Sequence, residues 1–328
     1  MDKKRILTAV IFFVIALGFI LWQRESPEFV KDEGAVFGTF YSITCKSPDG
    51  KSLQKEIEEV LQSVNASLSM FNDSSTISKI NRNEDVETDE IFEKVFFFAQ
   101  KISQKTDGAF DITVAPLVNL WGFGLKNREN VTAEMIDSAR QFVGYQNVIL
   151  ENHKLIKSNP NVMLDAGAIA KGFACDLVAD FLKKRKIKDF CIEIGGEIVV
   201  SGKNPKNKLW NIGINKPIES RGNINNDIEK EVKITDCAMA TSGNYRNFYE
   251  KDGKKFAHTI NPKTGSPVSH NLLSATIIAK DCMTADAFAT ACMVVGLESS
   301  VNLCKNNPEI RGIFIYEKNG KMEILDTK

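Results

Sequence analysis

Thr106-Asp-Gly-Ala-Phe-Asp-Ile-Thr-Val-Ala-Pro-Leu-Val118 follows a stretch with helical periodicity but does not continue it. Gly108 is typical of a residue just beyond a helix end, and Pro116 is disfavoured in a helix interior. The stretch therefore predicts a loop of defined shape directly after a helix. Loops of this kind, carried by a rigid scaffold, often hold a ligand.

Three further segments share this combination of small residues, isolated charges and glycines. They are Asp165-Ala-Gly-Ala-Ile-Ala-Lys-Gly172, His258-Thr-Ile-Asn-Pro-Lys-Thr-Gly265 and Thr284-Ala-Asp-Ala-Phe-Ala-Thr290. Four segments of this character in one chain predict that they meet at a single site.

Hydrophobic periodicity predicts a mixture of helices and strands. The helices are expected at about 51–69, 88–104 (capped by Thr88), 132–143, 168–184, 284–295 and 298–305. The strands are expected near 36–45, 147–150, 154–157, 161–165, 190–194, 198–201, 210–214, 232–234, 312–316 and 321–325, with a polar loop over 215–230. No regular alternation of strand and helix is present, which favours an α+β fold over a doubly wound sheet.

The composition is that of a globular protein with no excess charge. The chain has 328 residues, 43% of them hydrophobic, and Lys+Arg and Asp+Glu each total 42, so the formal net charge is zero. Nucleic acid is therefore not expected as a partner. The seven cysteines are widely spaced without a Cys-x-x-Cys pair, which argues against a zinc site and favours packing as small apolar residues. The sequence leaves open whether one pair of these cysteines forms a disulfide.

The N-terminus combines a basic cluster with an apolar run. Lys3-Lys-Arg5 precedes Ile6–Trp22, which carries no charge. This length is near the lower limit for a membrane span and the upper range of a signal-peptide core. Trp22 suits the membrane interface, and no Ala-x-Ala cleavage site or lipidation cysteine follows, so an uncleaved anchor is favoured over a cleaved signal peptide or a buried core helix. The positive-inside rule places Met1 in the cytoplasm. We assign residues 1–22 to the cytoplasmic tip and the anchor, 23–33 to a tether and 34–328 to the main domain.

Asp286 and Thr290 lie four residues apart on a predicted helix, so their oxygens share one face. A carboxylate and a hydroxyl suit a hard cation such as Mg²⁺ or Ca²⁺. The alternative is a local hydrogen bond between the two side chains.

The segment Asp165–Gly172 lies where a strand is expected to end and a helix to begin, and backbone N–H groups at such a place attract anions. Lys171 adds a charge for phosphate, although a purely structural turn has the same appearance. His258 precedes the turn Asn261-Pro-Lys-Thr-Gly265 and is a candidate general base, or else a hydrogen-bonded structural histidine. Glu193-Ile-Gly-Gly-Glu197 and Ala240-Thr-Ser-Gly-Asn-Tyr245 are interpreted as structural turns.

The ordered set of motifs resembles the ApbE family, the FAD:protein FMN transferases, over about residues 34–328. The matching motifs are Phe37-Gly-Thr39, Ser75-Thr-Ile-Ser-Lys-Ile-Asn81, Thr106–Asp111, Asp165–Gly172, Ile194-Gly-Gly-Glu197, Thr241-Ser-Gly243, His258–Gly265 and Thr284–Thr290. The resemblance implies a mixed domain with antiparallel sheets. It also implies Mg²⁺-dependent transfer of FMN from FAD to a Thr or Ser hydroxyl of an acceptor flavoprotein, with release of AMP.

The resemblance also implies roles for individual residues. His258 would deprotonate the acceptor hydroxyl; Mg²⁺ would be held by the backbone carbonyl of Ala168 together with Asp286 and Thr290; and FAD would be contacted by Phe37, Ala109, Phe110, Asp111, Asp165, Lys171 and Ile260. Three positions depart from the family pattern. Phe37 replaces a common Met, Thr76 a frequent Glu, and Ala289 an acidic metal ligand found in some members, which implies a lower metal affinity here.

Family members are commonly exported, which agrees with a catalytic domain on the periplasmic side of the inner membrane. The implied acceptor is a subunit of a membrane redox complex, such as Rnf or the Na⁺-translocating NADH:quinone oxidoreductase. Two alternatives remain: an FAD pyrophosphatase that forms FMN and AMP with water, and a non-catalytic flavin-binding membrane protein.

Overall fold

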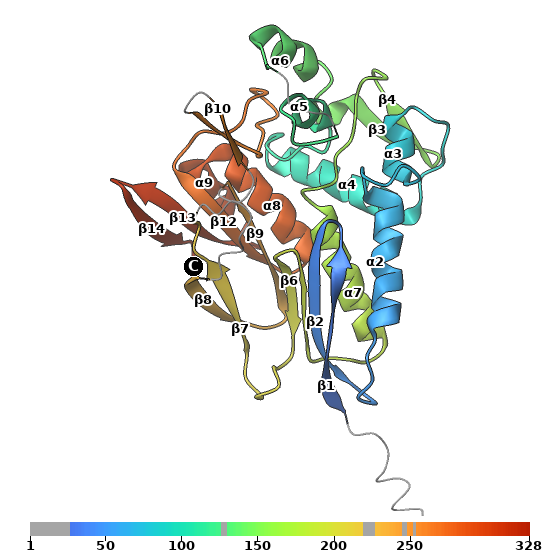
Figure 1. The fold of residues 1–328 in the computed structure, drawn as a ribbon, viewed down its shortest axis with the longest axis vertical. Helices are drawn as coiled ribbons and strands as arrows, with labels where there is room; N and C mark the ends of the chain where they lie inside the picture. Colours follow the sequence, from blue (N-terminus) through green and yellow to red (C-terminus); the bar gives the residue numbers. More distant parts are fainter. Residues whose placement is uncertain (1–26, 126–129, 219–226, 245–247, 252–253) are drawn as a thin grey trace, which may run out of the picture.

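The computed structural model describes residues 27–125, 130–218, 227–244, 248–251 and 254–328 (Figure 1). The predicted anchor, Ile6–Trp22, lies outside these residues. Within the described ranges, none of the helices has both the length and the apolar character needed to cross a membrane.

The fold is organised on one eight-stranded sheet, in which every neighbouring pair is antiparallel. In spatial order its strands are β1 (Glu28–Val36), β2 (Thr39–Ser47), β5 (Phe190–Ile194), β6 (Glu197–Ser201), β9 (Cys237–Gly243), β12 (Leu272–Ala279), β13 (Arg311–Lys318) and β14 (Lys321–Asp326). Three separate hairpins are formed by β3 (Val148–Glu151) with β4 (Lys154–Lys157), β7 (Trp210–Asn215) with β8 (Ile228–Ile234), and β10 (Phe248–Lys251) with β11 (Lys254–Ala257). The predicted α+β fold with antiparallel sheets is confirmed.

Helices cover one face of this sheet, and a hairpin covers part of the other. The helices are α2 (Gln54–Leu68), α3 (Thr76–Asn81), α4 (Glu90–Lys105), α5 (Ala115–Leu120), α6 (Ala133–Arg140), α7 (Ala170–Lys184), α8 (Cys282–Val295) and α9 (Leu297–Asn306), with a 3₁₀ turn at Tyr145–Asn147. α8 lies on β9 and β12, and α7 lies between α8 and α2 (Figure 1). Val200 and Ile315 point the other way, into a second core closed by the β7–β8 hairpin.

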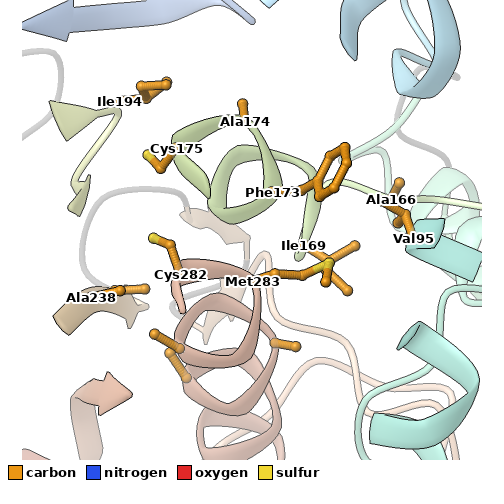
Figure 2. Packing of buried hydrophobic residues seen from close by; sticks show 14 of the residues in the cluster. Val95, Ala166, Ile169, Phe173, Ala174, Cys175, Ile194, Ala238, Cys282 and Met283 are labelled. Carbon is orange, nitrogen blue, oxygen red and sulfur yellow. The ribbon is translucent and has the colours of Figure 1, made fainter. Parts of the chain in front are cut away.

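The contact between α7 and α8 is the centre of the main core. Cys175 of α7 lies over Cys282 of α8, while Phe173 points toward Val95 and Ala166 (Figure 2). α8 is almost entirely buried, because apolar residues surround it on nearly every side. All seven cysteines are free thiols, and most are buried, as expected for small apolar side chains.

Several sequence-based boundaries differ from the structure. Residues 28–33, assigned to the tether, belong to β1 and pair with β2. The loop predicted over 106–118 ends in the short helix α5. Pro116 is compatible with this helix because it lies in the first turn, where its missing N–H costs no hydrogen bond. Asp89, rather than Thr88, caps α4. The strand expected at 161–165 is absent, because the Asn81 amide satisfies both the N–H and the carbonyl of Leu164 without a partner strand.

Candidate active site

The loop after α4 is held by its own side chains. Gly108 has φ +71°, a left-handed conformation that favours glycine. The Thr106 hydroxyl accepts the Phe110 N–H at 3.1 Å, and Ala109 and Phe110 are buried. The Asp111 carboxylate accepts hydrogen bonds from the Thr113 N–H (2.7 Å), the Thr113 hydroxyl (2.6 Å) and the Tyr145 N–H (2.8 Å).

Asp111 therefore has a structural function in addition to any contact with a ligand. Burial raises its pKa, while the hydrogen bonds from Thr113 and Tyr145 favour the ionised form. The loop also positions the next motif, because the Ile112 carbonyl accepts the Asp165 N–H at 2.7 Å.

The segment from Asp165 to Gly172 forms the entrance to α7. The Asp165 carboxylate accepts the Gly167 N–H at 2.7 Å, and burial raises its pKa. Ala168 is half-buried beside this turn. Lys171 extends from the first turn of α7 to Glu197, with Nζ 3.1 Å from the Glu197 Oε1, and also donates to the Gly167 carbonyl at 3.4 Å.

Gly172 brings α7 and α8 into direct contact. A Cβ atom at this position would lie 2.5 Å from the Cys282 carbonyl oxygen and 2.9 Å from the Asp286 Cβ, so only glycine fits. Its N–H donates to the Asp286 Oδ2 at 3.1 Å. From the same helix, the Asp176 carboxylate accepts the N–H groups of Cys282 and Met283, both at 2.8 Å. α7 thereby fixes both the start of α8 and the Asp286 side chain.

Two carboxylates and one ammonium group lie together at this contact. Asp286 and Glu197 are 2% and 4% exposed, and burial raises the pKa of each. Burial acts to lower the pKa of Lys171, but the charges of Glu197 and Asp286 outweigh this effect and raise it. A further cation at this contact would favour the ionised forms of both carboxyl groups.

The predicted metal ligands, Ala168, Asp286 and Thr290, offer oxygen donors. Within the described residues, no three His, Cys, Asp or Glu side chains gather into a metal cluster. Asp286 and Thr290 do share one face of α8, and the Thr290 hydroxyl lies 3.2 Å from the Ser242 Oγ on β9. A buried carboxylate, a hydroxyl and a main-chain carbonyl are ligands that suit a hard divalent cation. The residues present therefore fit Mg²⁺.

His258 is half-buried and lies edge-on to Phe123, with ring centroids 6.4 Å apart. The turn that follows it is rigid. The Asn261 side chain accepts the Lys263 N–H at 2.9 Å, and the Trp121 Nε1 donates to the Gly265 carbonyl at 2.8 Å. The histidine is thus held by a turn that is anchored to the helix after the first motif.

Ile260 packs in a small core with Leu117 and Trp121 and is 5% exposed. Its neighbour Thr259 donates to the Asn244 side chain at 2.7 Å, just beyond β9. The segment 258–265 is therefore tied both to α5 and to the end of the strand that carries Ser242.

Two tight hairpins lie side by side near Glu197. Phe37 has φ +52° in the β1–β2 turn and packs partly on the main core. The β5–β6 turn is Gly195-Gly196, with φ +64° and +100°, and the Gly195 N–H donates to the Phe40 carbonyl at 3.0 Å. This contact places the Phe37-Gly-Thr39 motif next to the turn that carries Glu197.

The four segments singled out in the sequence are therefore connected through direct contacts. Sequence reasoning missed Glu197, Ser242 and Asn244, which it left in structural turns. The available signal for Glu197 was a charged residue directly before the apolar strand run Ile198–Val200, where burial was to be expected.

The chain resembles known flavin transferases in sequence and in fold. The sequence model of the ApbE family matches residues 37–314. The chain is 36% identical to the FAD:protein FMN transferase of Haemophilus influenzae, covering 97% of this chain and 95% of that protein. It is 37% identical to the protein of the same name from Vibrio cholerae, over 90% of this chain and 91% of the relative. The solved flavin transferase ApbE from Vibrio cholerae superposes with a TM-score of 0.82 at 34% identity, covering 92% of this chain and 97% of the other.

Proposed function

This chain belongs to the ApbE family, and on that premise we propose that it is an FAD:protein FMN transferase whose reaction takes place where α7 meets α8. It transfers FMN from FAD to an acceptor protein. The observation that carries the location is the Gly172 contact, which brings Asp286 beside the Lys171–Glu197 pair. Phosphoryl transfer is served by a helix N-terminus that binds anions, by a cation held between oxygen ligands and by a histidine in a fixed position.

The acceptor group is a Thr or Ser hydroxyl. Its oxygen forms a bond to the FMN phosphorus of FAD, the pyrophosphate P–O bond to the AMP phosphate breaks, and AMP leaves with the bonding electrons. The hydroxyl proton passes to the His258 imidazole. A positioned base of this kind contributes about 10²- to 10⁴-fold to the rate.

The cation of the proposed site would be Mg²⁺, and the Ala168 carbonyl, the Asp286 carboxylate and the Thr290 hydroxyl would hold it. When bound, it would offset the negative charge of the pyrophosphate. Lys171 supplies a second positive charge to the same group, and Asp165, Asp111 and Tyr145 keep the surrounding loops in place.

We also propose that Ile6–Trp22 anchors the protein in the inner membrane with the catalytic domain on the periplasmic side. The support is the charge step between Lys3-Lys-Arg5 and the uncharged run. The acceptor is then a flavoprotein subunit of a membrane redox complex. Mass spectrometry of the protein purified from membranes tests the anchor, and a mature N-terminus between residues 20 and 30 would refute it.

One experiment separates transferase, pyrophosphatase and flavin binder. The purified protein is incubated with FAD, MgCl₂ and a flavin-acceptor protein, and samples are divided between a denaturing gel viewed by flavin fluorescence and chromatography of free nucleotides. A fluorescent acceptor band with equimolar AMP is expected. Free FMN and AMP without a fluorescent band would identify a pyrophosphatase, and bound but intact FAD would identify a flavin binder.

A further inference from the structure

Glu197 has a buried carboxylate with one oxygen unused. It is the first residue of β6, follows the Gly195-Gly196 turn and is 4% exposed. Its Oε1 lies 3.1 Å from the Lys171 Nζ, whereas its Oε2 is buried without a hydrogen-bond partner among the described residues. An acceptor buried in this way costs free energy, and a carboxylate costs more than a neutral group. Stability alone does not account for a carboxylate at this position.

Lys171 adjoins two carboxylates: its Nζ lies 3.1 Å from the Glu197 Oε1, and the N–H of the next residue, Gly172, donates to the Asp286 Oδ2 at 3.1 Å. The four-carbon stem of a lysine is flexible, so its ammonium group moves to whichever carboxylate attracts it most. In the structure it is held by Glu197 and the Gly167 carbonyl. Asp286 instead accepts the Gly172 N–H. If Glu197 lost its charge, Asp286 would be the remaining buried carboxylate near Lys171.

We propose that Glu197 is a positioning residue that holds the Lys171 ammonium on β6 and thereby keeps the Asp286 carboxylate available to a divalent cation. This inference rests on the proposed function, because it concerns the cation site of the FMN transferase. An ammonium paired with Asp286 would compete with the cation for the same oxygen atoms. Glu197 acts on the cation site through Lys171, without contacting the cation itself.

The test measures Mn²⁺ binding to the full-length protein, without FAD or acceptor, by the electron paramagnetic resonance signal of free Mn²⁺. Glu197→Gln keeps the side-chain shape but removes the charge, and we expect Mn²⁺ affinity to fall about tenfold, within the range for residues behind a metal ligand. The matched control is Glu193→Gln, an exposed residue of the same hairpin, which should bind Mn²⁺ as the wild type does.

The decisive comparison adds Lys171→Met. The double variant, Glu197→Gln with Lys171→Met, should bind Mn²⁺ more tightly than Glu197→Gln, because the competing ammonium is gone. Its affinity should lie within about twofold of that of Lys171→Met alone. A double variant that binds Mn²⁺ as weakly as Glu197→Gln, or a Glu197→Gln protein with the affinity of the wild type, would overturn the inference. A structural lesion would not be rescued by a second substitution, so rescue excludes misfolding as the cause. A wild-type protein that binds no Mn²⁺ would refute the proposed cation site and the inference together.

Discussion

Gly172→Ala tests whether the close approach of α7 to α8 is required. The added methyl group would meet the Cys282 carbonyl oxygen at 2.5 Å and the Asp286 Cβ at 2.9 Å. Neither atom is the far end of a flexible side chain, so the two helices would have to separate by roughly 0.5–1 Å to restore ordinary contact. Separation would also lengthen the 3.1 Å hydrogen bond from the Gly172 N–H to Asp286.

Two opposing terms set the size of the effect. Alanine in place of glycine stabilises a helix by at most about 1 kcal/mol, because Gly172 lies in the first turn of α7. Overpacking of a well-filled core costs about 1–3 kcal/mol. We expect the overlap to prevail, with a net loss of up to about 3 kcal/mol and a fall in melting temperature of about 2–4 °C for each kcal/mol lost. Because Asp286 moves with α8, the Mg²⁺ concentration for half-maximal FMN transfer should rise as well.

Circular dichroism melting and a Mg²⁺ titration of FMN transfer measure the two effects. Asp180→Ala, at an exposed position of the same helix, is the control and should change the free energy of unfolding by no more than about 0.5 kcal/mol. A Gly172→Ala protein that melts at or above the wild-type temperature with an unchanged Mg²⁺ dependence would refute the argument that this contact positions Asp286.

Four further substitutions probe separate parts of the site. Asp286→Ala should abolish FMN transfer at low Mg²⁺, because Ala289 offers no replacement carboxylate, while Thr290→Val should be milder; an unchanged Mg²⁺ dependence in Asp286→Ala would contradict the metal assignment. His258→Asn should bind FAD, followed by flavin fluorescence quenching, but transfer FMN roughly 10²-fold more slowly; near-wild-type rates across pH 6–8 would exclude the base. Burial raises the pKa of Asp176 to about 7, above the unfolded value of about 3.9. The contribution of protonated Asp176 to the free energy of unfolding is therefore fully present below about pH 4 and is lost as the pH rises towards 7. The melting temperature of the wild type should therefore fall between about pH 4 and 7, and Asp176→Asn should weaken this fall. A variant whose melting temperature depends on pH as that of the wild type does would show that Asp176 is not the cause.

Much of the candidate site could be predicted because its residues lie in short segments whose local conformation the sequence indicates. Asp286 and Thr290 share a helix face whatever surrounds the helix, and Gly108 marks the end of α4 in any fold. The α+β class followed from the absence of regular strand and helix alternation, whereas the antiparallel sheets were implied by the family resemblance. The strand expected at 161–165 was wrong because an apolar run cannot reveal that a distant amide, Asn81, satisfies its backbone.

The sequence by itself determined which residue types were available for chemistry and which local conformations they favour. The tertiary structure decided which of them meet. Gly172 and Asp286 are 114 positions apart, and Trp121 and Gly265 are 144 apart. Such contacts depend on how whole helices and strands pack, and periodicity within a short window carries no information about them. Glu197 is the clearest case: it resembles a turn residue in the sequence, and only the packing of α7 against β6 turns it into the buried partner of Lys171.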